Sequence, residues 1–237
     1  MADGLTNVSG NEMCEGDSGQ LPASKLGTKE FWDEAYSTEL GNFHDTGDVG
    51  EVWFGESSMN RIIKWIKNCP DIRKISLFLD LGCGNGILLV NLAQCGYTNL
   101  IGVDYSEGAI NLARSIAVAE QVSIRFQVCD ILSTSEISAL CTDRKFDVCL
   151  DKGTYDAISL NPEDTKGCRV KYIDNVFSLL AAGGRFIICS CNWTKTELLV
   201  QFKDKFEFLE DLPAPSLSFG GQTGNTVTTL VFTARNT

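Results

Sequence analysis

The segment Phe78–Gly86, with the sequence FLDLGCGNG, constrains the fold of this chain more than any other part. An apolar run typical of a buried strand leads into Asp80, and glycines follow at every second position, at 82, 84 and 86. Glycine lets a backbone turn tightly and approach a ligand closely. The next residues, 87–94, have the pattern of a helix, whose free N–H groups point back at the turn. This order predicts a site for a nucleoside-containing cofactor in an α/β sheet.

A second acid, Asp104, ends the next predicted strand and lies 24 residues after Asp80. At this spacing an α/β sheet places a carboxylate against ribose hydroxyls. The dinucleotide fingerprint G-x-G-x-x-G requires a third glycine where Ile87 stands, which argues against a nicotinamide dehydrogenase. The pattern D-x-G-x-G-x-G instead resembles motif I of the class I S-adenosylmethionine-dependent methyltransferases. A glycine-rich turn without a ligand is the structural alternative.

Short apolar strands alternate with helix patterns from residue 75 onwards. Such alternation predicts a mostly parallel sheet with helices on both faces. The last two strands, in FEFLEDL and TVTTLVFTA, are expected to form an antiparallel hairpin at the sheet edge. The resemblance implies the same class, an α/β Rossmann-like methyltransferase fold with a seven-stranded, mostly parallel sheet and an antiparallel C-terminal hairpin.

At 237 residues the chain is expected to form one folded domain. Residues 1–27 are polar and rich in Gly, Ser and Asn, which predicts a disordered N-terminal tail. The methyltransferase domain then covers 28–237 and begins with an extension of helices and loops over 28–70. In this extension Thr28 is expected to cap a short helix, and Ser57 or Ser58 a second one, with a loop over 41–56 between them.

Four predicted strands end in an acid, and the carboxyl ends of such strands are where ligands bind in these sheets. Some of these acids could instead cap the helices that follow. The resemblance implies that Asp104 takes the ribose hydroxyls, that Tyr105 packs on the adenine, and that Asp130 and Ile131 contact the adenine amino group and ring. Asp130 could alternatively be a loop cap. The cofactor contacts expected in this way are Asp80, Gly82, Cys83, Gly84, Asp104, Tyr105, Asp130, Ile131 and Asp151.

Asp151 opens the segment DKGTYDAI. Amino-methyltransferases that act on nucleobases usually have D/N-P-P-aromatic here, so the replacement of the prolines argues against a nucleobase substrate. Asp151 and Tyr155 are the residues expected to orient the acceptor nitrogen by hydrogen bonds. Tyr155 could equally belong to the packed face of a short helix.

The loop before the second helix contains Trp53 and Phe54 among glycines and acids. Aromatic side chains in such a loop can cover a cofactor or enclose a cation, or they can anchor the loop to the core. We expect Trp53 to close the site. The segments SCNWTK (190–195) and FGGQTGN (219–225) are expected to rim the acceptor site.

Composition narrows the classes of partner. The formal net charge of −11 argues against binding to a phosphate backbone and suits a basic partner such as a lysine-bearing protein surface. Ten cysteines without a C-x-x-C pair favour buried thiols in a reducing cytosol over a zinc ribbon or disulfides. His44 is the only histidine, which excludes a two-histidine metal site. No apolar run predicts a membrane span. We therefore expect a cytoplasmic protein, with a nuclear fraction left open, and no metal, nucleic acid or membrane partner.

Further segments carry a narrower resemblance: FWDEAYSTEL, GDVGEVWFGE, LDLGCGNG, GVDYS, DKGTYDAISLNP, SCNWTK and SFGGQTGNTV. Together they resemble the methyltransferases that modify a lysine of translation elongation factor 1-alpha. The resemblance implies S-adenosylmethionine as the methyl donor, S-adenosylhomocysteine as the product, elongation factor 1-alpha as the protein substrate, and a monomer. A small-molecule methyltransferase and a non-catalytic cofactor-binding module are the alternatives.

Overall fold

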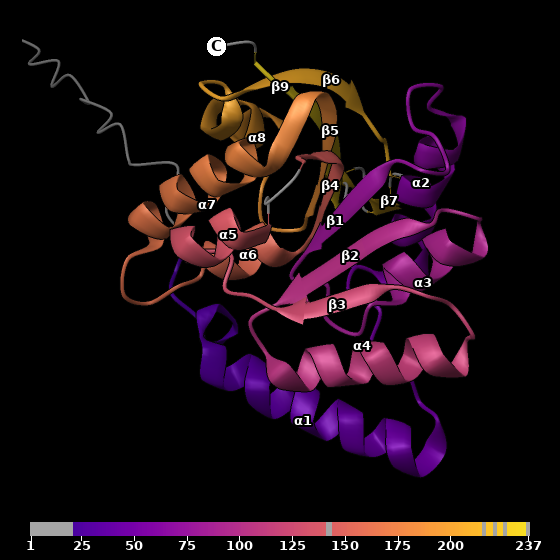
Figure 1. The fold of residues 1–237 in the computed structure, drawn as a ribbon. Helices are drawn as coiled ribbons and strands as arrows, with labels where there is room; N and C mark the ends of the chain where they lie inside the picture. The colour runs from indigo at the N-terminus through magenta and orange to yellow at the C-terminus, as the bar shows by residue number, and fades with distance from the viewer. Residues whose placement is uncertain (1–20, 141–143, 215–216, 220–221, 225–226, 236–237) are drawn as a thin grey trace, which may run out of the picture.

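The computed structural model describes residues 21–140, 144–214, 217–219, 222–224 and 227–235, and these contain one seven-stranded sheet. Figure 1 shows the sheet with helices on both faces. Its strands are, from one edge to the other, β3 (Arg125–Val128), β2 (Asn99–Asp104), β1 (Leu77–Leu81), β4 (Phe146–Lys152), β5 (Leu180–Ser190), β9 (Thr228–Ala234) and β6 (Phe206–Asp211). The expected α/β, mostly parallel, seven-stranded fold is therefore confirmed.

The strands from β3 to β5 are parallel, whereas β9 pairs antiparallel with both β5 and β6. The expected antiparallel C-terminal pair is thus present, with β9 inserted between β5 and the edge strand β6. A separate two-stranded ribbon, β7 (Leu217–Phe219) and β8 (Gln222–Gly224), interrupts the connection from β6 to β9. The expectation that 219–225 rims the acceptor site falls partly outside the described residues.

Successive residues of each central strand enter different halves of the core because side chains alternate across a sheet. Phe78 packs in the cluster under α2, α3 and α4, while its neighbour Leu79 packs in the cluster under α5, α7 and α8. Burial on both faces explains why the strands are continuously apolar. The helices that cover the sheet are α2 (Gly55–Asn68), α3 (Ile87–Gln94), α4 (Glu107–Ala119), α5 (Thr134–Leu140), α6 (Thr154–Ile158), α7 (Thr165–Leu179) and α8 (Lys195–Phe202).

Helix α1 (Lys29–Thr46) lies along the outside of α4 (Figure 1). Thr28 caps it as expected, since its side chain accepts a hydrogen bond from the Phe31 N–H (3.4 Å). The expectation of a short helix and a loop from residue 41 is wrong, because the helix continues to Thr46 and ends at Gly47 in the left-handed conformation. Apolar contacts with α4 hold this added turn, for Leu40 and Phe43 pack against the same cluster as Leu112.

Helix α2 begins at Gly55, so the expected caps Ser57 and Ser58 lie inside its first turn. A tight turn starts the helix instead: the Gly55 N–H donates to the Val52 carbonyl (2.8 Å), and Phe54 has a φ of +63°. The sequence analysis placed residues 21–27 in the disordered tail, yet Lys25–Gly27 forms a 3₁₀ helix. The chain reaches this position because Gly27 lies against the Leu160 backbone, where a Cβ would come within 2.3 Å.

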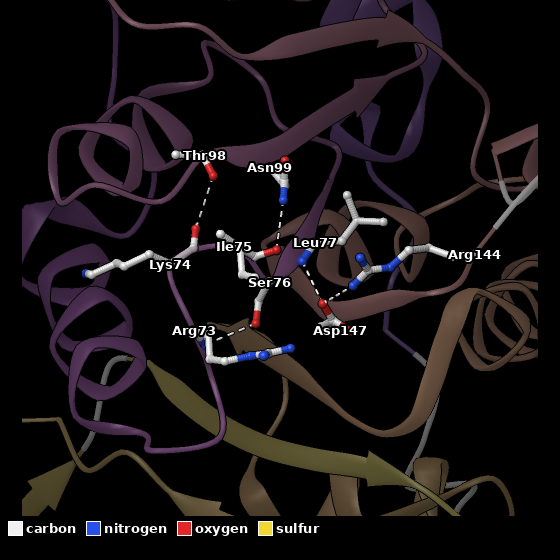
Figure 2. A network of polar contacts seen from close by, with 9 residues as sticks. All are labelled: Arg73, Lys74, Ile75, Ser76, Leu77, Thr98, Asn99, Arg144 and Asp147. Atoms are coloured by element: carbon white, nitrogen blue, oxygen red, sulfur yellow. Dashed lines mark hydrogen bonds and ion pairs between the residues drawn. The ribbon is translucent and has the colours of Figure 1, made fainter.

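Polar contacts join the amino ends of the central strands (Figure 2). The Leu77 N–H donates to Asp147 Oδ2 (2.7 Å), which also pairs with Arg144 (2.5 Å). Asn99 Nδ2 donates to the Ile75 carbonyl (2.8 Å), and Thr98 Oγ1 to that of Lys74 (3.4 Å). This end of the sheet is closed by its own side chains, and the cavity described next opens at the other end.

Candidate active site

A cavity of about 340 Å³ opens at the carboxyl ends of β1, β2 and β4. Its walls come from five parts of the chain: the glycine turn after β1, the turns after β2 and β3, the turn after β4 with α6, the turn after β5, and the N-terminal residues 26–54. This is the position at which ligands bind in open α/β sheets. Most of the expected cofactor contacts line it, namely Gly82, Cys83, Gly84, Asp104, Tyr105, Asp130 and Ile131.

The glycine turn has the geometry that its sequence predicts. Gly82, Gly84 and Gly86 have φ values of +66°, +53° and +73°, a region that side chains disfavour. A Cβ on Gly82 would lie 2.2 Å from Thr154 Oγ1, and one on Gly84 would lie 2.4 Å from the Tyr36 hydroxyl oxygen. Backbone strain and space therefore both require glycine at these two positions.

The Asp104 carboxylate joins two turns of the cavity wall. Its Oδ2 accepts a hydrogen bond from the Gly84 N–H (3.0 Å) and its Oδ1 from the Ser106 N–H (2.9 Å). Burial raises the pKa of Asp104 to about 6, although both backbone bonds oppose the shift. A carboxylate oxygen can accept more than one hydrogen bond, so ligand hydroxyls could still bind Asp104.

Asp80 lies behind the wall. Its side chain is buried, and no described residue donates a hydrogen bond to its carboxylate. Burial raises the pKa of Asp80 to about 7, while the positive charge of Lys152 opposes that shift. Lys152 itself lines the cavity. The sequence analysis did not identify Lys152 as a site residue, although a lysine directly after an acid at the end of a buried strand is unusual.

The residues expected against the adenine lie together on one side of the cavity. Tyr105 is half-buried, and its hydroxyl lies 3.5 Å from the Thr28 carbonyl of the N-terminal segment. Ile131 is buried and also lines the cavity. Asp130 lines the cavity and caps its own loop, because its Oδ1 accepts from the Leu132 N–H (2.8 Å). The loop-cap alternative for Asp130 is therefore confirmed, and its contact with adenine stays a prediction.

Asp151 lies beneath the wall rather than on it. Its Oδ1 accepts from the Thr154 N–H (2.9 Å), and its Oδ2 accepts from the Tyr155 N–H (2.9 Å) and the Tyr172 hydroxyl. Burial raises the pKa of Asp151 to about 7. These contacts give the carboxylate a structural task, which is to shape the turn between β4 and α6. They place neither of its oxygens among the groups that line the cavity.

Tyr155 is also not part of the cavity wall. It is 1% exposed, its ring packs against Tyr172 and Phe202 at centroid distances of 5.2 and 5.1 Å, and its hydroxyl donates to Gln201 Oε1 (2.5 Å). Of the two alternatives left open by the sequence, these contacts support the packed face of a short helix.

Aromatic side chains form the outer wall. Trp53 lines the cavity, and its ring meets that of Trp32 edge-on at 5.0 Å; that it closes the site stays a prediction. Tyr36, stacked on Trp32 at 5.9 Å, and Phe54 line the cavity too. Trp32 and Tyr36 were not among the residues expected at the site. Helix α1 instead brings both of them to the cavity.

Asp156 links the turn after β5 to the cavity, another feature that sequence reasoning missed. Its carboxylate accepts from the Ser190 hydroxyl and from the Cys191 N–H (2.7 Å). Ser190 Oγ in turn accepts from the N–H groups of Asn192 (3.2 Å) and Trp193 (3.0 Å). Cys191 and Asn192 line the cavity, and the expectation that SCNWTK rims the acceptor site stays a prediction. The sequence signal that could have identified Asp156 is its position five residues after Asp151, on the same short helix as Tyr155.

The described parts of the chain contain no group of three or more histidine, cysteine or acidic side chains that could hold a metal ion. None of the described helices has both the length and the apolar character needed to cross a bilayer.

Comparison with known proteins identifies the class. A family model described as a methyltransferase domain matches residues 73–233. Solved structures share the fold, at identities that support the fold alone. A TehB-like S-adenosylmethionine-dependent methyltransferase from Corynebacterium glutamicum has a TM-score of 0.56 and 20% identity, covering 86% of this chain and 98% of that one. The magnesium protoporphyrin IX methyltransferase from Synechocystis with bound S-adenosylmethionine has a TM-score of 0.57 and 18% identity, covering 85% and 97%.

Curated relatives narrow this class. The protein named EEF1A lysine methyltransferase 2 is 51% identical in Danio rerio, over 88% of each chain, and 48% identical in Homo sapiens, over 92% of this chain and 89% of that one. The protein-lysine N-methyltransferase efm4 of Schizosaccharomyces pombe is 41% identical over 90% and 95%. The chain therefore belongs to the methyltransferase family, within the group of protein-lysine methyltransferases named EEF1A lysine methyltransferase 2.

Proposed function

We propose that this enzyme transfers a methyl group from S-adenosylmethionine to a lysine side chain of translation elongation factor 1-alpha. The main support for this proposal is the 48–51% sequence identity, over about 90% of the chain, to relatives named for that substrate. The net charge of −11 supports a basic protein partner. We also propose that the enzyme is a monomer and that it encounters this protein partner in the cytoplasm. We propose no nucleic-acid partner and no metal.

The cavity fits the proposed cofactor in three respects. Gly82 and Gly84 leave a cradle that a Cβ would fill. Asp104 has a buried carboxylate that can accept hydrogen bonds from ribose hydroxyls. Asp80 adds a buried carboxyl behind the glycine turn, and its charged form would attract the cationic end of such a cofactor. Tyr105 and Ile131 would hold the base, as the class resemblance implies.

When bound, S-adenosylmethionine supplies an electrophilic methyl group on a positively charged sulfur. The acceptor lysine must present a neutral amine, and burial of its nitrogen beside a positive charge lowers its pKa towards that form. Positioning and exclusion of water are therefore the main tasks of the protein. Trp53 covers the cavity. Asp156, whose pKa burial raises, holds the polar wall at Cys191 and Asn192 that we assign to the acceptor.

The test is incubation of the full chain with methyl-labelled S-adenosylmethionine and purified elongation factor 1-alpha, followed by peptide mass spectrometry. Label on one lysine, with a mass that gives the methyl count, is the expected result. Binding of the methyl donor without label on the factor would refute the substrate and keep the cofactor. Label on small molecules of a lysate instead would favour the small-molecule alternative.

A further inference from the structure

The segment 49–54, called the strap below, forms part of the cavity wall through Glu51, Trp53 and Phe54. Three of its backbone carbonyls accept hydrogen bonds from side chains of other segments. Asn85 of the glycine turn donates from Nδ2 to the carbonyls of Val49 (3.0 Å) and Glu51 (3.3 Å). Lys152 donates from Nζ to the carbonyl of Trp53 (3.3 Å). The carbonyls of every second residue of the strap are thus bound by side chains from two different walls of the cavity, the glycine turn and the end of β4.

The strap is also held in a strained form at its end. Phe54 has a φ of +63°, a conformation that a bulky side chain adopts only where its surroundings impose it. Its ring lies over Gly153, where a Cβ would be 3.0 Å from the ring, so the residue next to Lys152 contributes a second contact to the strap. The turn after β4 therefore holds both the carbonyl of Trp53 and the ring of Phe54.

The group of Lys152 that contacts the strap is a partly buried ammonium. Loss of water around the side chain lowers its pKa, and the negative charge of Asp80 opposes that shift. A hydrogen bond from a charged donor is stronger than one between neutral groups. Because Lys152 lines the cavity, this bond joins the cavity wall to the strap.

We propose that Lys152 is a positioning residue: by holding the Trp53 carbonyl it fixes the strap, and with it the Trp53 ring, over the cofactor, so that cofactor release requires this bond to break. The inference rests on the proposed cofactor. It assigns to Lys152 control of the lifetime of the bound product rather than contact with the reacting atoms.

The test compares Lys152→Met with wild type in the dissociation rate of S-adenosylhomocysteine, measured by stopped-flow displacement, and in methyl transfer kinetics. Loss of one charge-assisted hydrogen bond should accelerate dissociation about tenfold or more and raise KM for S-adenosylmethionine similarly. kcat at saturating donor should fall much less than KM rises, because Lys152 holds the strap and does not contact the reacting atoms. Amide hydrogen exchange should show that S-adenosylhomocysteine protects residues 50–55 in wild type and much less in the variant.

Lys74→Met is the matched control. Lys74 Nζ also donates to a backbone carbonyl, that of Cys95 (2.9 Å), and it lies at the opposite end of the sheet (Figure 2). This control loses the same charge and the same kind of bond, so it should leave dissociation unchanged. Lys152→Arg, which keeps a charged donor, should restore most of the slow release.

The outcomes separate the two proposals. A wild-type chain that does not bind S-adenosylhomocysteine would remove the basis of both the function and this inference. Binding by wild type with equal dissociation rates in Lys152→Met would overturn the role of Lys152 alone. If Lys152→Met does not fold, as judged by circular dichroism, Lys152→Gln takes its place, since its amide keeps a neutral donor and should accelerate dissociation less than loss of the side chain but measurably.

Discussion

Replacing Tyr155 by Phe separates the two roles considered for this residue. The change deletes one hydroxyl, which donates to Gln201 Oε1, and keeps the ring that packs against Tyr172, Trp193 and Phe202. Gln201 Oε1 also accepts from Arg169 (3.0 Å), so no buried acceptor is left without a donor. Loss of one such hydrogen bond lowers the free energy of unfolding by about 1 kcal/mol. In a domain of this size that corresponds to a melting temperature lower by roughly 2–4 °C.

Urea unfolding and steady-state methyl transfer measure the two roles in parallel. Because the hydroxyl lies outside the cavity wall, kcat and both KM values should change less than twofold. Tyr97→Phe is the matched control: its hydroxyl donates to the Ile66 carbonyl (3.3 Å) in the other half of the core. A fall in kcat of tenfold or more in Tyr155→Phe, with the control unaffected and cofactor affinity intact, would refute the packing role and restore Tyr155 as a residue that orients the acceptor.

Three other substitutions test the cavity. Gly84→Ala would place a Cβ 2.4 Å from the Tyr36 hydroxyl at a φ of +53°, so calorimetry should show S-adenosylhomocysteine affinity reduced at least about tenfold, or about 1.4 kcal/mol; unchanged affinity would contradict the cradle. Asp80→Asn should flatten the pH dependence of stability. Wild-type Asp80, with its pKa raised from 3.8 to about 7, binds its proton more tightly when folded, so the unfolding free energy falls as pH rises from about 4 to 7, by up to about 4 kcal/mol. Urea titrations at pH 5 and pH 8 measure this, and equal slopes in both proteins would exclude Asp80 as the source. Asp156→Asn should lower kcat more than about tenfold with cofactor affinity within twofold, because Ser190 and Cys191 donate to different oxygens of Asp156 and one of these becomes an NH2 donor; a normal kcat would show that this wall does not serve the acceptor.

The parts of the site that the sequence predicted are those in which local backbone geometry and ligand chemistry coincide. Gly82 and Gly84 could be predicted because positive φ and close approach both require glycine. Asp104 could be predicted because strand ends meet at one edge of a parallel sheet. In such cases the spacing along the chain determines the position in space.

The residues that could not be predicted depend on contacts between distant segments. Trp32 and Tyr36 reach the cavity only because α1 packs along α4, an arrangement that no local pattern encodes. The strand-end rule misplaced Asp151, since the rule gives the edge of the sheet but not the direction of the side chain. Three donors of the turn and of α7 turn its carboxylate inwards. Lys152, one residue later, points to the opposite side and lines the cavity.

The cavity has two origins in the chain. The region shared with the wider methyltransferase family, residues 73–233, supplies the sheet and the loops at its carboxyl edge, whereas the aromatic outer wall comes from residues 26–54, before that region. One part can therefore diverge in sequence while the other stays fixed. New side chains on this peripheral helix and strap can then reshape one wall of the cavity without a rebuilt sheet, while Cys191 and Asn192, in the shared region, form another. Among relatives that share the cofactor, this N-terminal segment is one place where preference for one protein partner over another can be exchanged.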